Sequence, residues 1–258
     1  MPQMRRPAQS PMVQPDQNFC TSHNSQNTKS MKAYHGNPLI KTEYLNRVVA
    51  HRAADQLIQG YGYWKDGKGC AVGCTIHGGG NDRYQQYEMQ IGVPAILARL
   101  EEYVFENTEP DYAKLWPERF LAAIEPGADL SLVWPKWAKW MLTDPEFGVL
   151  KHAETDRRRK AIETVAALYD RWIAGAKPAT DEWRAAAAYA AYAAAAAAAA
   201  AAAYAAYAAY AAYAYAAYAY AAAAAATYAY AARKRIRLAQ AEKLIELLKE
   251  APVIGGEK

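Results

Sequence analysis

AAAAYAAYAAAAAAAAAAAYAAYAAYAAYAYAAYAYAAAAAATYAYAA, residues 185–232, is the stretch that decides the fold of this 258-residue chain. This Ala/Tyr run holds 36 Ala, 11 Tyr and Thr227, and it contains no Gly, Pro or charged residue. Ala has the highest intrinsic helix propensity, so the run predicts one continuous α-helix. At about 1.5 Å per residue, that helix would be roughly 70 Å long. Such a length is typical of a scaffold, a spacer or an assembly surface.

Most tyrosines of the run share one face of the predicted helix. At about 100° per residue, the following fall within an arc of roughly 140°: Tyr189, Tyr192, Tyr204, Tyr207, Tyr210, Tyr215, Tyr218 and Tyr228. Much of the opposite face is Ala alone, which lets another helix approach closely. So large an exposed apolar surface usually marks an interaction site. We expect the partner that covers it to be the chain itself or another helical protein. A neutral expansion of a repetitive tract is the alternative.

The chain becomes amphipathic after the run. A basic cluster comes first, formed by Arg233, Lys234, Arg235 and Arg237. An apolar stripe follows, formed by Ala241, Leu244, Ile245 and Leu248. The stripe must be buried, so we expect it to dock on the globular part or in a helical pair. With a second basic cluster at residues 157–160, the sequence leaves nucleic-acid binding as an alternative, although the net charge of +4 is small.

The rest of the chain divides into a tail and a helical part. Residues 1–37 are rich in Gln, Asn, Ser and Pro, which predicts a flexible tail. From residue 38 to 178, apolar residues recur at helical spacing, with Thr42 as an expected N-cap and Pro117 as an expected helix break. No segment shows a convincing strand period. We therefore predict an all-α fold: a compact helical domain, then residues 179–250 as one very long Ala/Tyr helix with an amphipathic C-terminal end.

Two clusters in the helical part could bind a ligand. Trp134, Trp137 and Trp140 recur every three residues, which predicts a core stripe, with an aromatic cage as the alternative. Residues 60–80 contain eight glycines, which predicts a loop or a tightly packed short helix.

The glycine-rich segment also carries Cys70, Cys74 and His77, which would share one face of a helix. Thiolates and imidazole bind zinc, and His51 is a candidate to complete the coordination, as are Asp82 and Glu88. Structural zinc sites usually have two separated ligand pairs, and the second pair is missing here. Buried structural cysteines are therefore the alternative. Nucleophilic catalysis by a cysteine, with a histidine as base, is another.

The motif GCAVGCTIH at residues 69–77, with YE at 87–88 and IGVP at 91–94, resembles uncharacterised bacterial and phage proteins. In those proteins an Ala/Tyr-rich helix also follows a Trp-rich helical part. The resemblance covers about residues 34–248. It implies no established activity and transfers no catalytic residue.

Composition sets the expected surroundings and function. Three cysteines make no disulfide framework, and the segment after Arg5 and Arg6 lacks the apolar stretch of a secretory signal. No stretch rich in Leu, Ile, Val and Phe reaches membrane-spanning length. We therefore expect a cytoplasmic protein without membrane contact. The leading hypothesis is a non-enzymatic scaffold or assembly protein; the alternatives are a zinc-binding protein or cysteine-dependent enzyme, and a nucleic-acid-associated protein.

Overall fold

The computed structural model describes residues 32–61, 63–80, 82–190, 192 and 215–254, with the backbone alone for residues 215–230. The described chain is mostly helical, which confirms the all-α class. Its elements in chain order are η2 (Ala33–Gly36), α1 (Pro38–Ala53), β1 (Trp64–Lys65), β2 (Lys68–Gly69), α2 (Ala71–Ile76), α3 (Arg83–Ile91), α4 (Ala95–Asn107), α5 (Pro110–Ala123), α6 (Val133–Thr143), η3 (Val149–His152), α7 (Asp156–Ile173) and α9 (Tyr215–Lys249). Residues 180–190 are also helical.

The first long helix begins earlier than predicted. The Asn37 side chain accepts a hydrogen bond from the Leu39 N–H at 2.9 Å, and Pro38 occupies the first turn, where no N–H donor is needed. Thr42 is therefore not the cap; its hydroxyl donates to the Pro38 carbonyl inside the helix. The helix ends at Ala53, earlier than Gly60, where the sequence pattern predicts a stop because glycine is typical of helix C-termini.

Pro117 does not divide α5. Proline inside a helix costs about 3 kcal/mol, because it lacks an N–H donor and crowds the preceding turn. Here its neighbours Trp116, Phe120 and Leu121 are all fully buried. Burying each of these large side chains stabilises the helix by roughly 1.5–3 kcal/mol, which outweighs the cost of the proline.

The folded part begins before residue 38, inside the expected tail. Ala33 exchanges backbone hydrogen bonds with Gly127 and Ala128, at 2.8 and 3.0 Å. The Tyr34 side chain is fully buried, and its hydroxyl donates to the Leu121 carbonyl at 2.8 Å. Residues 32–37 are therefore part of the folded domain, and Ala33 and Tyr34 belong to its core. The expected tail up to residue 31 lies outside the described residues.

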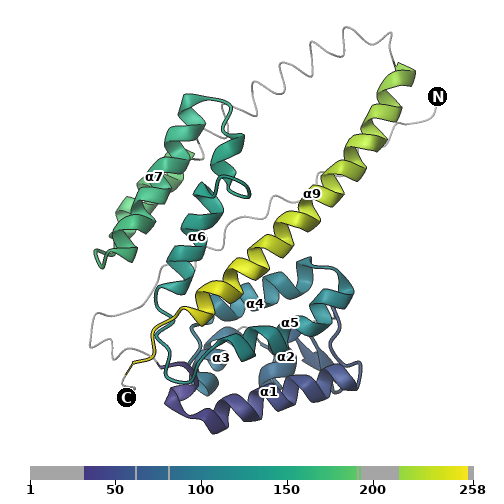
Figure 1. Ribbon diagram of the computed structural model, residues 1–258, viewed down its shortest axis with the longest axis vertical. Coiled ribbons are helices and arrows are strands. Elements are labelled where there is room, and N and C mark those ends of the chain that lie inside the picture. The colour runs from purple at the N-terminus through teal and green to yellow at the C-terminus, as the bar shows by residue number, and fades with distance from the viewer. Residues whose placement is uncertain (1–31, 62, 81, 191, 193–214, 255–258) are drawn as a thin grey trace, which may run out of the picture.

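The amphipathic end of α9 docks on the globular part, one of the two expected outcomes. Figure 1 shows α9 crossing the layer formed by α4 and α5, with α6 on its other side. Its apolar stripe is buried in the common core. Arg119 holds Glu242 through two hydrogen bonds of 2.8 and 2.9 Å, and Trp137 donates to the Gln240 carbonyl at 3.0 Å. The C-terminal part of α9 therefore shares one core with the helices that precede residue 178.

The two described ends of the Ala/Tyr run lie on different parts of the fold. Residues 180–190 lie beside α7, where the Trp183 ring is 4.8 Å from that of Tyr169. The other end is the first half of α9, which extends past α4 and α5 in Figure 1. Residues 193–214 are outside the described part, so one continuous helix stays a prediction. No helix among the described residues has the length and apolar character needed to cross a membrane.

We predict that Leu244→Ala lowers the free energy of unfolding by about 2–5 kcal/mol, because it leaves a cavity where α9 enters the core. Leu244 is fully buried, whereas Leu39 is 75% exposed. Leu39→Ala, the matched control, should change stability by less than about 0.5 kcal/mol. Urea denaturation of both variants measures the difference. Equal, small effects would show that α9 does not contribute to the core.

Candidate functional site

The glycines of residues 69–79 allow another part of the backbone to lie directly on α2. A Cβ atom at Gly73 would be 1.2 Å from the Tyr63 carbonyl oxygen, and one at Gly69 would be 2.0 Å from the same atom. A Cβ at Gly79 would be 2.7 Å from the Tyr63 Cβ. The predicted tightly packed short helix is thus present, and the glycine density reflects close packing.

The two cysteines face the core. The Cys70 thiol caps α2, accepting from the Gly73 N–H at 3.5 Å, and the Cys74 thiol donates to the Gly69 carbonyl at 3.5 Å. Burial raises the pKa of both thiols to about 12. They are therefore protonated at neutral pH, whereas nucleophilic attack and metal ligation require a thiolate. This arrangement fits the alternative of buried structural cysteines.

The histidines meet on the outer side of the same segment. His51, on α1, and His77, at the C-cap of α2, have their Nε2 atoms 2.7 Å apart. The His51 Nδ1 atom lies 2.6 Å from the Gln56 Oε1 atom. The Trp64 ring stacks on the His77 ring with centroids 4.5 Å apart. His77 is exposed at the surface, but partial desolvation by the groups packed around its ring, with the positive charge of Arg47 next, lowers its pKa, so the ring is neutral at neutral pH.

The four predicted metal ligands therefore do not form one site. The structure brings His51 and His77 together and separates them from the thiols, whose hydrogen bonds go elsewhere. Across the described residues, no three His, Cys, Asp or Glu side chains are grouped as metal ligands. Asp82 and Glu88 accept hydrogen bonds from Gln86 and Ala95 instead. Neither thiol hydrogen-bonds to a histidine, so the structure does not form the Cys–His pair that the catalytic alternative requires.

A buried carboxyl group was missed by the sequence reasoning. Glu101 on α4 is fully buried, and burial raises its pKa to about 8, although the nearby Tyr87 hydroxyl acts in the opposite direction. Its position carried a signal: Glu101 lies four residues after Leu97 and four before Phe105, on the apolar face of the helix. Its carboxyl group is therefore protonated at neutral pH in the folded protein.

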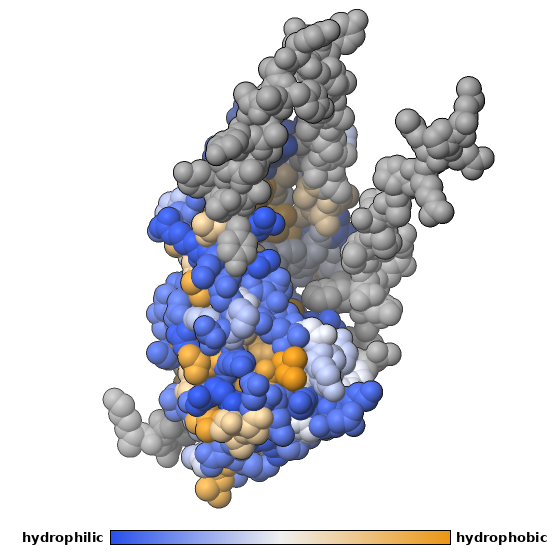
Figure 2. Space-filling view, turned by 90° about the vertical axis from the view of Figure 1, so that its right-hand side faces the viewer, coloured by the Kyte–Doolittle hydropathy of each residue, from blue (hydrophilic) through white to orange (hydrophobic). Residues whose placement is uncertain are grey.

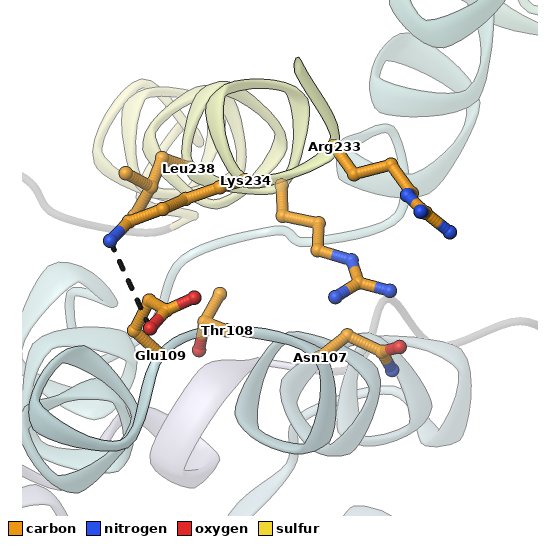
Figure 3. Close-up of a pocket in the computed structure, with 7 residues that line it drawn as sticks. Asn107, Thr108, Glu109, Arg233, Lys234 and Leu238 are labelled. Atoms are coloured by element: carbon orange, nitrogen blue, oxygen red, sulfur yellow. Dashed lines mark ion pairs between the residues drawn. The ribbon is translucent and has the colours of Figure 1, made fainter. Parts of the chain in front are cut away.

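The basic cluster of α9 lines a pocket against the junction of α4 and α5 (Figure 3). There the Lys234 Nζ atom lies 3.8 Å from the Glu109 carboxylate. Arg235 pairs with Glu146, on the loop after α6. In the second basic cluster, Arg158 pairs with Glu154 at 2.9 Å. Several of the basic side chains therefore serve intramolecular ion pairs, and this weakens the argument for a nucleic-acid surface.

The predicted interaction tyrosines fall in three groups. Tyr189 and Tyr192 are described; the Tyr192 side chain is 61% exposed, with the Arg157 guanidinium over its ring at 5.1 Å. Outside the described residues lie Tyr204, Tyr207 and Tyr210. On α9, with only their backbone described, are Tyr215, Tyr218 and Tyr228.

None of the protein-family models, curated proteins or solved structures compared with the chain matches it. Function is therefore argued from the geometry of these residues.

We predict that the wild-type protein loses folding stability as the pH rises, because Glu101 ionises, and that the Glu101→Gln variant does not show this loss. The unfolded carboxyl ionises near 4.5 and the folded one near 8, so the folded state retains a proton that the unfolded state releases. The contribution of Glu101 to the free energy of unfolding is fully present below pH 4.5. It decreases by up to about 1.4 kcal/mol for each pH unit above that, until the pH passes 8.

Urea denaturation across this range should show wild type losing stability relative to the Glu101→Gln variant as the pH rises. The exposed Glu163→Gln on α7 is the control and should follow wild type. Parallel curves for wild type and Glu101→Gln would contradict the prediction.

Proposed function

We propose that this chain is a non-enzymatic assembly protein that associates with a second copy of itself through the Ala/Tyr run. The observation that carries the proposal is that α9 is anchored in the core at its C-terminal end. Its C-terminal stripe is buried in the core, while its Ala/Tyr half extends past α4 and α5 (Figure 1). A helix fixed at one end holds the uncharged segment in a defined direction, which reduces the entropy lost on association.

Composition supports association over a solvent-exposed spacer. A helix that crosses solvent alone is normally charged on most faces, whereas residues 185–232 carry no charge. We propose that the run is helical throughout, since nothing in it disfavours a helix. The face of the globular part seen in Figure 2 is largely hydrophilic, with its hydrophobic residues in separate patches. The run is thus the better candidate for a contact surface.

A second copy is the partner that the chemistry favours. The Ala face permits close helix approach, and identical helices offer each other the same Ala and Tyr faces. Each Tyr side chain can bury roughly 150 Å² or more, so several tyrosines with the intervening Ala approach the 800 Å² per partner of a typical stable interface. At about 25 cal/mol per Å², this area is sufficient for association. In-register parallel pairing would bring the two Arg233–Arg237 clusters together, so charge repulsion favours an antiparallel arrangement.

The alternatives have less support. A cysteine-dependent enzyme needs a thiolate near a base, and both thiols are buried with a raised pKa. Nucleic-acid binding needs available cations, and Lys234 and Arg235 already pair with carboxylates.

We predict that the wild-type chain has at least twice the mass of one chain in light scattering. Replacing Tyr207, Tyr210 and Tyr218 with Glu should yield a species of single-chain mass, because charges on the shared face oppose burial. Glutamate is a good helix former, so the helix itself remains favoured. Tyr61→Glu, at a 43% exposed tyrosine of the globular part, is the control and should leave the mass unchanged.

Deleting the chain after about residue 180 cannot replace these substitutions as a way to remove the Ala/Tyr run, because the shortened chain would also lack Leu244 and Leu248 of the core. Circular dichroism of each full-length variant checks that it is folded. A wild type of single-chain mass, or equal masses for wild type and the triple variant, would contradict the proposal.

A further inference from the structure

The imidazole pair, His51 and His77, forms the most specific polar arrangement on the described surface that the assembly role does not use. We propose that it is a binding site for a late first-row divalent metal ion such as Zn²⁺, with both Nε2 atoms as ligands and no cysteine ligand. The inference is independent of self-association. It rests on the convergence of two nitrogen atoms from helices α1 and α2 to 2.7 Å.

Gln56 fixes the protonation state that a ligand needs. Its Oε1 atom can only accept a hydrogen bond, so the contact of 2.6 Å assigns the proton of His51 to Nδ1. The Nε2 atom of His51 then has its lone pair directed at His77. Metal-bound histidines usually donate their second N–H to a carbonyl or carboxyl oxygen in this way.

The free protein holds a proton where the metal would be. With the His51 Nε2 atom unprotonated, the His77 Nε2–H donates to it. Metal binding moves this proton to Nδ1 of His77, so each ring keeps one N–H and no net proton is released. At Zn–N distances of about 2.0–2.1 Å and a tetrahedral angle, the nitrogens would lie about 3.3 Å apart. The rings therefore need to separate by about 0.6 Å, and each needs to tilt by about 35° so that both lone pairs point at the metal.

The surroundings hold the rings and leave room for other ligands. Trp64 stacks on His77 and meets the His51 ring edge-on, with centroids 5.1 Å apart. His77 is exposed, so water or an added ligand can complete the coordination. The nearest cation, Arg47, donates to the Thr75 carbonyl and pairs with Glu43 at 2.8 Å, which offsets its charge.

The thiols are excluded for a physical reason. Cys70 and Cys74 are buried on the inner side of α2, and their hydrogen-bond partners are other groups. The close contact between Gly73 and the Tyr63 carbonyl packs the backbone of residue 63 on α2 in the orientation that keeps both thiols buried. A site with two histidines and solvent therefore differs from the four-ligand site that the sequence suggested.

Calorimetric titration of the full chain with Zn²⁺ tests the proposal, and we expect one ion per chain. His51→Gln and His77→Gln should each weaken binding by at least about tenfold, and Gln56→Leu by about tenfold through loss of orientation. His23→Gln, His35→Gln and His152→Gln are matched controls that change other histidines and should bind as wild type does. Melting temperatures check that each variant is folded. Because two ligands are each replaced, the test still holds if one of the two histidine variants does not fold.

Co²⁺, which takes the place of Zn²⁺, reports the ligand type. A spectrum without sulfur-to-cobalt charge-transfer absorption supports two imidazoles, and its presence overturns the proposal. Absence of Zn²⁺ binding, or equal weakening by the control substitutions, also overturns it.

Discussion

Burial of the apolar stripe of α9 is the interaction on which the rest of the structure depends. Ala241, Leu244 and Leu248 are buried where α9 packs against α4, α5 and α6. Polar contacts fix the register, because Glu242 binds Arg119 and the Gln240 carbonyl accepts from Trp137. Near the end of the described chain, Val253 forms a β-bridge with Ala128, whose carbonyl also accepts a hydrogen bond from Ala33 at the start of the fold. Residues more than a hundred positions apart thus form one core, and this core sets the direction of the helix that precedes it.

The contact between Tyr63 and the glycines at positions 69, 73 and 79 organises the other end of the molecule. Because Gly69 and Gly73 lack side chains, the backbone at residue 63 lies against α2, and Trp64 reaches the ring of His77. The same contact fixes α2 so that its thiols face the core and the imidazole faces solvent. This contact therefore keeps the two cysteines in the core and His77 at the surface, although the sequence motif suggested one set of ligands.

Local sequence patterns correctly predicted the features that depend on neighbouring residues in the chain. Helical class, the packed helix at residues 71–76 and the docking of the stripe follow from propensity, glycine density and periodicity. The failures depend on distant partners. Pro117 stays inside α5 because neighbouring large side chains are buried, and Tyr34 belongs to the core because Leu121 offers its carbonyl. Glu101 lies on the apolar face of α4, but its burial depends on side chains of other helices, such as Tyr87 of α3, which no local pattern shows.

The candidate site was predicted in composition but not in geometry. Helical spacing placed Cys70, Cys74 and His77 on one face, whereas the left-handed backbone at His77 ends the helix and redirects the ring toward His51. Only the tertiary packing of α1 on α2 brings the two imidazoles together.

Hydrogen exchange of the native protein tests the central claim most directly. If the C-terminal part of α9 completes the core, the amides of residues 241–248 exchange as slowly as those of α2 and α5, through global unfolding. Fast exchange at 241–248 while α2 and α5 remain protected would show that α9 detaches independently, and would contradict the account.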